Sequence, residues 1–312
     1  MISLDPDLKQ KLLCCEDLPS LPQLALELLN ELEKTEPDEA YLVELFKSDL
    51  AIATRVLKVA NSPLYGFVRQ IPTIEEAVRL LGLKKCTLIS LSFYVIQATK
   101  KPYPTGFDFT HFFQRGLFSA TAAMVLGKDL ALDVDLDSLF LCGLIQDIGV
   151  LVLACVDQAS YTQAVQPIYP DHAALAAIEN KLYGCDHAKI GSWLIEQWHF
   201  PTQLVSAISK SHQYQAGSSP LSNTVAASGF IADTFIAPSF QKLEVLTNAQ
   251  AMLHRLLNLS PTQIDQQMVH INEAIKEVSE WFNQPDLIDI GDETLKVIEE
   301  RQSELINKLD DE

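Results

Sequence analysis

Residues 139–156, with the sequence LFLCGLIQDIGVLVLACV, form an apolar run that is interrupted once, by Gln146 and Asp147. A carboxylate in so apolar a segment is costly to bury unless a cation, a metal or several hydrogen-bond donors compensate it, or its pKa rises. We therefore expect Asp147 to lie either in a functional site or in a structurally satisfied core position. The central Gln-Asp pair and the absence of basic flanks favour a buried core helix over a membrane span.

Composition and charge narrow the class of protein. The chain has 312 residues, 48% of them hydrophobic and only 12 of them glycine, which fits one large or two modest helical domains. A formal net charge of −18 opposes binding to nucleic-acid phosphates and to anionic membranes. The N-terminus lacks the apolar segment of a signal peptide, and six scattered cysteines without a CxxC pair predict reduced thiols. We therefore predict a cytoplasmic protein.

Apolar residues recur at helical spacing in nearly every segment, so the predicted fold class is all-α. Thr73 and Glu76 predict a capping box at the start of one helix, and Gly82 predicts its end. Further helices are predicted at 22–34, 49–60, 87–97, 108–127, 136–156, 171–183, 185–199, 201–213 and 220–236. Breaks at 99–108 and near 237–241 predict an N-terminal helical part (1–98), a helical core (99–236) and a C-terminal helical extension (237–312). The amphipathic helices of the extension would pack against the core, a partner or a second copy in a homodimer.

Four polar residues of the middle part are candidates for a metal site: Asp147, His187, His212 and Asp233. Imidazoles and carboxylates dispersed over an all-helical core are the ligands that a metal site in a helical bundle requires. Each also has a structural explanation, because a buried histidine often bonds a carbonyl group and a core aspartate often pairs with Arg or a hydroxyl. The residues alone leave both interpretations open. The common phosphate-loop, dinucleotide, serine-hydrolase and zinc-protease motifs are absent from the sequence.

Several phrases, in order, resemble the HDOD domain family, a bacterial signal-transduction branch of the HD phosphohydrolase superfamily. They are LPSLPQLALELLNEL, SDLAIATRVLKVANSPLYG, IPTIEEAVRLLGLKKCTLISL, GLIQDIGVLVLA and HAKIGSWLIEQWHFPTQLVSAISKSH. The resemblance covers roughly residues 18–212 and implies a multi-helix HDOD fold, with an N-terminal helical part, an HD-like core and a separate C-terminal extension. Asn61, Ser62 and Gly66 match a family motif, and we expect them to form a helix cap and a turn.

The resemblance also shows where the chain departs from catalytic HD enzymes. In those enzymes an early-helix histidine, a His-Asp doublet and a later Asp bind a divalent metal that activates water. Here the resemblance places Arg115 at the early histidine and Gln146 at the histidine of the doublet, while Asp147 is retained. Glutamine is a poor transition-metal ligand and arginine is none. We expect the Arg115 guanidinium to neutralise Asp147 instead. The vestigial site then consists of Arg115, Gln146, Asp147, His187, His212 and Asp233.

The leading hypothesis is a non-catalytic signalling module that binds a protein or a ligand and needs no cofactor. The alternative is a metal-dependent phosphohydrolase acting on a nucleotide or cyclic dinucleotide, its divalent metal held by Asp147, His187, His212 and Asp233. A third hypothesis is a pseudoenzyme that binds a nucleotide phosphate at Arg115 without cleaving it. The expected partners are a signalling protein, a nucleotide ligand and a second copy of the chain, but neither nucleic acid nor a membrane.

Overall fold

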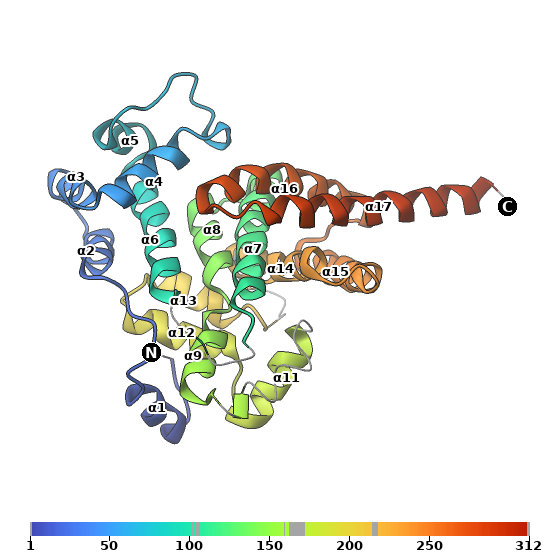
Figure 1. Cartoon of the computed structure of the whole chain (residues 1–312), viewed down its shortest axis with the longest axis horizontal. Coiled ribbons are helices and arrows are strands. Elements are labelled where there is room, and N and C mark those ends of the chain that lie inside the picture. The colour runs from blue at the N-terminus through green and yellow to red at the C-terminus, as the bar shows by residue number, and fades with distance from the viewer. Residues whose placement is uncertain are drawn as a thin grey trace. The chain divides into compact units, whose positions relative to one another are not determined.

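The computed structural model describes residues 2–100, 103, 107–158, 160–161, 172–213 and 218–310 (Figure 1). All regular secondary structure in these ranges is helical, which confirms the predicted all-α fold class. The chain forms two compact units, each assembled from separate segments. The first comprises Met1–Phe107, Leu144–Tyr169 and Ala173–Lys210, and the second comprises Asp108–Gly143, Pro170–His172 and Ser211–Glu312. The three-part division at residues 98 and 236 stays a prediction.

The first half of the first unit is a cluster of helices around α6. Its elements are α1 (Pro6–Leu13), α2 (Gln23–Leu32), α3 (Glu39–Ser48), α4 (Leu50–Ala60), the 3-10 turn η1 (Pro63–Tyr65), α5 (Ile74–Leu81) and α6 (Leu83–Thr99). Helices α2, α4 and α5 all pack against α6, which is apolar on every side and mostly buried. Thr73 caps α5 by accepting a hydrogen bond from the Glu76 N–H. Gly82 then turns the chain by 117° into α6 with φ of +89°, a value that suits glycine.

The second half of the first unit contains further helices, one of which begins with His187. Its elements are α9 (Ile148–Val156), α11 (His172–Tyr183, whose first residue is grouped with the second unit), α12 (His187–Gln197) and α13 (Thr202–Ser209). Helix α12 packs against both α9 and α13.

The predicted single helix at 136–156 is wrong in one respect, because it is two helices. Helix α8 (Leu136–Ile145) ends before Gln146, and α9 begins after Asp147, which has φ of −100° and ψ of 10°. A negative charge is favourable at a helix N-terminus and unfavourable inside an apolar helix. The break therefore places the carboxylate of Asp147 at the N-cap of α9 rather than in mid-helix.

The second unit packs its helices around α14. Its elements are α7 (Phe109–Asp129), α8, α14 (Pro220–Ile236), α15 (Lys242–Leu257), α16 (Pro261–Phe282) and α17 (Asp286–Asp310). Helix α14 lies between α7 and α15, and α16 packs against α7 and α17 (Figure 1). Phe118 of α7 stacks on Phe235 of α14 with ring centroids 4.6 Å apart. The helices of the predicted C-terminal extension therefore pack against core helices of this unit.

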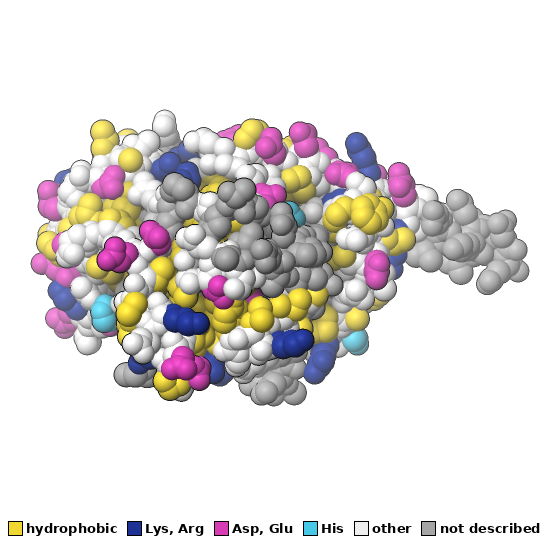
Figure 2. All heavy atoms as spheres, turned by 60° about the horizontal axis from the view of Figure 1, so that its bottom comes forward, with side chains coloured by type: hydrophobic (Ala, Val, Ile, Leu, Met, Phe, Trp, Pro, Cys, Tyr) yellow, Lys and Arg dark blue, Asp and Glu magenta, His cyan; other side chains and the backbone are white. Residues whose placement is uncertain are grey.

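The apolar helices and the surface charges can be compared with the predictions that the chain neither spans a membrane nor binds nucleic acid. Among the described residues, one segment is long and apolar enough to cross a membrane by itself. It is Leu136–Val156, which comprises α8, the two-residue turn and α9, and 89% of its apolar window is buried. Such burial is typical of a core helix. On the face drawn in Figure 2, the described acidic side chains are spread singly among apolar and neutral ones, and Lys and Arg form no broad cluster there. Cytoplasmic localisation stays a prediction.

The environment of Lys242 leads us to expect that the free energy of unfolding rises with pH in the alkaline range. Its buried ammonium group donates hydrogen bonds to the Phe235 carbonyl and, at 3.0 Å, to Thr294 Oγ1, so it links α14, α15 and α17. Burial lowers the pKa of Lys242 to about 8, from 10.5. Between these two values the unfolded chain binds more protons than the folded one, so the contribution of Lys242 to the free energy of unfolding rises with pH.

Denaturant titrations of the wild type and Lys242→Met at several pH values from 7.5 to 10.5 measure this contribution. The difference in the free energy of unfolding, wild type minus variant, should increase steadily across that window. A difference that stays constant with pH would show that the ammonium group titrates normally in the folded protein.

Candidate metal site

A close crossing of α9 and α12 brings Asp147 and His187 together. An alanine Cβ at Gly149 would lie 2.0 Å from the His187 carbonyl oxygen, and one at Gly191 would lie 2.9 Å from the Gly149 nitrogen. The two helices therefore touch through their backbones, which only glycine permits at these positions. Asp147 directly precedes α9 and His187 is the first residue of α12. His187 Nε2 consequently lies 3.5 Å from Asp147 Oδ1.

His187 is fixed from its other side by a buried carboxylate. Glu179 Oε2 lies 2.5 Å from His187 Nδ1 and also accepts a hydrogen bond of 2.8 Å from the His187 backbone N–H. The second oxygen, Oε1, accepts a hydrogen bond of 2.5 Å from the Tyr161 hydroxyl. All three residues are fully buried. The ring of His187 is therefore held in one orientation, with Nε2 towards Asp147.

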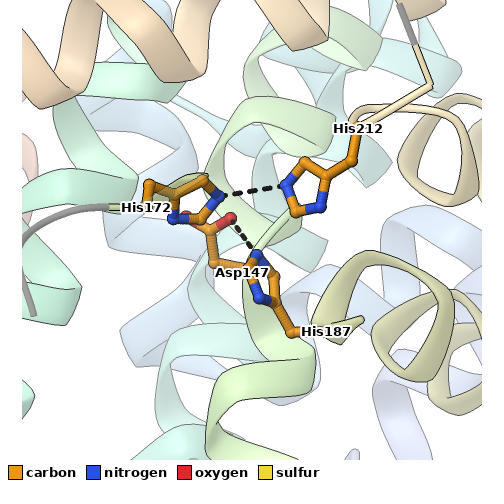
Figure 3. Close-up of side chains that lie close together, drawn as sticks. All are labelled: Asp147, His172, His187 and His212. Atoms are coloured by element: carbon orange, nitrogen blue, oxygen red, sulfur yellow. Dashed lines mark hydrogen bonds and ion pairs between the residues drawn. The ribbon is translucent and has the colours of Figure 1, made fainter. Parts of the chain in front are cut away.

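We use the name Asp-His cluster for four potential metal ligands, Asp147 and His187 of the first unit and His172 and His212 of the second (Figure 3). Each offers one ligand atom. His172 Nε2 and His212 Nε2 are 3.0 Å apart. Donors on one tetrahedral zinc ion are separated by about 3.3 Å, which follows from zinc–nitrogen distances of about 2.0–2.1 Å. Asp147 and His187 of the first unit, and His172 and His212 of the second, are therefore candidate metal ligands.

The structure brings together three of the four ligands predicted for a metal. Asp147, His187 and His212 belong to the Asp-His cluster, and its fourth member is His172. Asp233 is not a member and pairs with Arg115 instead. Sequence reasoning omitted His172 and Glu179. Two signals were present in the predicted helix 171–183. His172 lies at its start, and Glu179 is a carboxylate eight residues before His187.

Arg115 forms an ion pair with Asp233 in the second unit. Arg115 Nε lies 2.8 Å from Asp233 Oδ1, and the guanidinium also donates to the Gly229 carbonyl at 3.4 Å. The arginine side chain is 4% exposed and that of Asp233 is 16% exposed. Gln146 is buried in the turn before α9. The predicted neutralisation of Asp147 by Arg115 stays a prediction.

Asn61, Ser62 and Gly66 build a turn after α4. Asn61 is the C-cap of α4, and its amide donates to the carbonyls of Leu57 and Ile71 while accepting from the Ile71 N–H. Ser62 Oγ accepts from the Leu64 N–H, and Gly66 has φ of +70°. These hydrogen bonds fix the loop that joins α4 to α5, and they account for the three residues structurally.

Comparison with known proteins settles the family. The profile of the HDOD domain matches residues 18–214. The chain belongs to the HDOD domain family. An uncharacterized protein of Treponema pallidum (strain Nichols) is 26% identical over 213 residues, which are 63% of this HDOD chain and 38% of that protein. The chain thus spans well under half the length of this curated relative.

Solved structures share the HDOD fold. A candidate phosphohydrolase from Shewanella amazonensis SB2B has a TM-score of 0.63 at 23% identity, covering 93% of this chain and 98% of that one. An HDOD domain protein with unknown function from Geobacter sulfurreducens has a TM-score of 0.61 at 20% identity, covering 88% and 99%. A candidate metal-dependent phosphohydrolase from Shewanella amazonensis SB2B has a TM-score of 0.58 at 20% identity, covering 93% and 96%. At these identities the likeness establishes the fold.

Proposed function

We propose that this HDOD protein is a non-catalytic regulatory module that works by binding a signalling protein or a nucleotide. The observation that carries the proposal is the ion pair between buried Arg115 and partly buried Asp233. By the family resemblance, these two positions hold a histidine and an aspartate that bind the metal in catalytic HD enzymes. In this chain a permanent cation occupies the first position and bonds to the carboxylate at the second.

The chemistry of the substituted groups opposes hydrolysis. A guanidinium has no lone pair to offer a metal, and its charge disfavours a divalent cation beside it. The amide of Gln146, at the position of the doublet histidine, is a weak transition-metal ligand. Activation of water by a metal needs a coordination position that the protein leaves open. If all four members of the Asp-His cluster bind one ion, they complete a tetrahedral set, as in structural zinc sites.

A phosphohydrolase acting on a nucleotide or cyclic dinucleotide is the second candidate. It is favoured by the Asp-His cluster itself, because a metal there with a fifth, exchangeable position would activate water. The two Shewanella amazonensis proteins of similar fold are described as a candidate phosphohydrolase and a candidate metal-dependent phosphohydrolase. The proposed partners, a signalling protein and a second copy of this chain, follow from the family resemblance and the amphipathic C-terminal helices.

Recovery of intact nucleotides tests the proposal. Wild-type protein is incubated with Mn²⁺, Fe²⁺ or Zn²⁺ and a panel of nucleoside mono-, di- and triphosphates and cyclic dinucleotides, and the products are separated by chromatography. Each nucleotide should be recovered uncleaved, at the level seen with Asp147→Ala, because no open metal position activates water. Cleavage of any member of the panel that disappears in Asp147→Ala would establish the phosphohydrolase instead.

A further inference from the structure

We propose that a second copy of this chain docks on an exposed surface of the first unit, which we call the Arg69–Arg79 surface. Its members are Phe67, Val68, Arg69, Arg79 and Leu80. The segment that docks there is the acidic outer face of α17 of the other copy. The inference rests on the proposed function in treating a second copy of this chain as one of the bound partners.

The first observation is a local surplus of positive charge in an acidic chain. Residues 51–85 contain six Lys and Arg against two Asp and Glu, whereas the whole chain has 23 against 41. Arg69 Nη2 lies 2.5 Å and Arg79 Nη2 lies 3.5 Å from the same oxygen, Oε1 of Glu76. The two arginine side chains are 70% and 69% exposed. One carboxylate thus balances two guanidinium groups, and the surface keeps a net positive charge in contact with solvent.

The second observation is that apolar side chains stand in solvent beside these arginines. Val68 is fully exposed, Phe67 is 36% exposed and Leu80 is 38% exposed. Phe67 and Val68 directly precede Arg69, and Leu80 follows Arg79 in α5, on the helix face that also carries Glu76. Aromatic and other apolar side chains together with arginine are the composition that protein–protein interfaces favour. The Arg69–Arg79 surface has this composition.

The loop that carries Phe67 and Val68 is held in place at both ends. The Asn61 amide donates to the Ile71 carbonyl at 2.9 Å and accepts from the Ile71 N–H at 2.7 Å, which closes the loop at its base. The ion pair of Arg69 with Glu76 ties the outer part of the loop to α5. The connection loops out beyond α4 and α5 (Figure 1). A segment that is ordered before binding loses less conformational entropy when a partner docks.

The third observation is a complementary acidic face on α17. Residues 286–301 contain six Asp and Glu against two Lys and Arg. Asp286, Asp289, Glu293 and Glu300 are all exposed, and their spacings of three, four and seven residues place them on one face of the helix. Carboxylates form strong, charge-assisted hydrogen bonds with guanidinium groups. The chain itself therefore carries both members of a complementary pair, and in a two-fold symmetric dimer this contact would form twice.

The competing explanation is that these residues form an ordinary surface, since single exposed apolar side chains are common. Two variants of the surface separate the explanations. Arg69→Glu combined with Arg79→Glu reverses its charge, and Val68→Asp removes its most exposed apolar group.

Each variant has a matched control in the first unit. Lys11→Glu combined with Lys181→Glu makes the same change in net charge at two other exposed residues. Leu13→Asp makes the same kind of change at another exposed apolar residue, which is 64% exposed.

Sedimentation velocity of the full chain at low to high micromolar concentration measures self-association, and circular dichroism checks that each variant is folded. The wild type should form a dimer that added NaCl weakens, because salt screens the charges. The double arginine variant and Val68→Asp should each raise the dissociation constant of the dimer by about tenfold or more. The controls should stay within about twofold of the wild type.

A charge exchange identifies the docking segment. Asp289→Lys combined with Glu300→Lys reverses the acidic face of α17 and should weaken the dimer as the double arginine variant does. An equimolar mixture of these two double variants should associate again, because each copy then supplies the charge that the other lacks.

Four results would overturn the inference. They are a wild type that stays monomeric at every concentration, a control as disruptive as its counterpart, a mixture of the two reversed variants that stays monomeric, and a wild type that binds phosphatidylserine vesicles through these arginines instead of a second copy. If the double arginine variant does not fold, wild-type association of Val68→Asp would overturn it equally. Nucleotide hydrolysis by the wild type would contradict the proposed non-catalytic role and leave the dimer contact unaffected.

Discussion

Gly149→Ala is expected to lower the free energy of unfolding by about 3 kcal/mol or more, at the upper end of overpacking substitutions. The added methyl group would lie 2.0 Å from the His187 carbonyl oxygen and 2.7 Å from the Gly191 nitrogen, both of which are backbone atoms. Backbone atoms of a helix cannot rotate aside, so α9 and α12 must separate along their shared surface. The substitution also moves Asp147 and His187 apart, so Zn²⁺ binding should weaken in any fraction that folds.

Chemical denaturation of purified Gly149→Ala measures the loss, and Gly184→Ala is the matched control. Gly184 also lies in the first unit, but a Cβ there meets no atom within 4 Å, and the cost arises only from its φ of +69°. We expect a loss of about 1 kcal/mol for Gly184→Ala. Equal stability of the two variants would mean that the helices are not in backbone contact at Gly149.

Arg115→Ala is expected to lower the free energy of unfolding by about 3 kcal/mol. Removal of one partner from a buried ion pair typically costs about 3–5 kcal/mol, because the remaining charge loses its counter-ion. Asp233 keeps 16% of its side chain exposed, so we place the loss at the lower end of that range. The hydrogen bond from the guanidinium to the Gly229 carbonyl is lost as well.

Two further variants make the result for Arg115 specific. Arg79→Ala removes a guanidinium whose side chain is 69% exposed and whose partner, Glu76, lies 3.5 Å away, so its effect should stay within about 0.5 kcal/mol. Arg115→Ala combined with Asp233→Ala should be less destabilising than the sum of the single changes, because the single variants share one interaction. Strict additivity would contradict the ion pair as the source of the stability.

Much of the fold follows from local patterns in the sequence. The spacing of apolar residues predicts the helices, and Thr73 and Gly82 mark the start and end of α5 where the structure has them. The break between α8 and α9 is the instructive exception, because composition alone makes 139–156 a single apolar helix. The interruption falls at Gln146 and Asp147, and the Asp147 carboxylate then lies at the N-terminus of α9, where a negative charge is favourable. The period of the apolar residues does not include this electrostatic effect.

The candidate site was predictable only in part, because it depends on packing between distant segments. The isolation of Asp147 in an apolar run and the inward face of His187 are visible in the sequence. The pairing of Arg115 with Asp233 joins residues more than a hundred positions apart, and no local pattern in the sequence indicates it. The roles of Glu179 and Tyr161 depend on the packing of the start of α12, where Glu179 accepts hydrogen bonds from the His187 N–H and the Tyr161 hydroxyl.

The most direct test of the central claim is the hydrolysis of an activated phosphodiester, bis(p-nitrophenyl) phosphate, by metal-loaded protein. This substrate has a good leaving group and demands the least of a catalyst, so it detects even a weakly activated water. The account predicts that wild-type protein saturated with Zn²⁺ or Mn²⁺ releases nitrophenolate no faster than Asp147→Ala. A metal-dependent rate that is present in the wild type and absent from Asp147→Ala would contradict it.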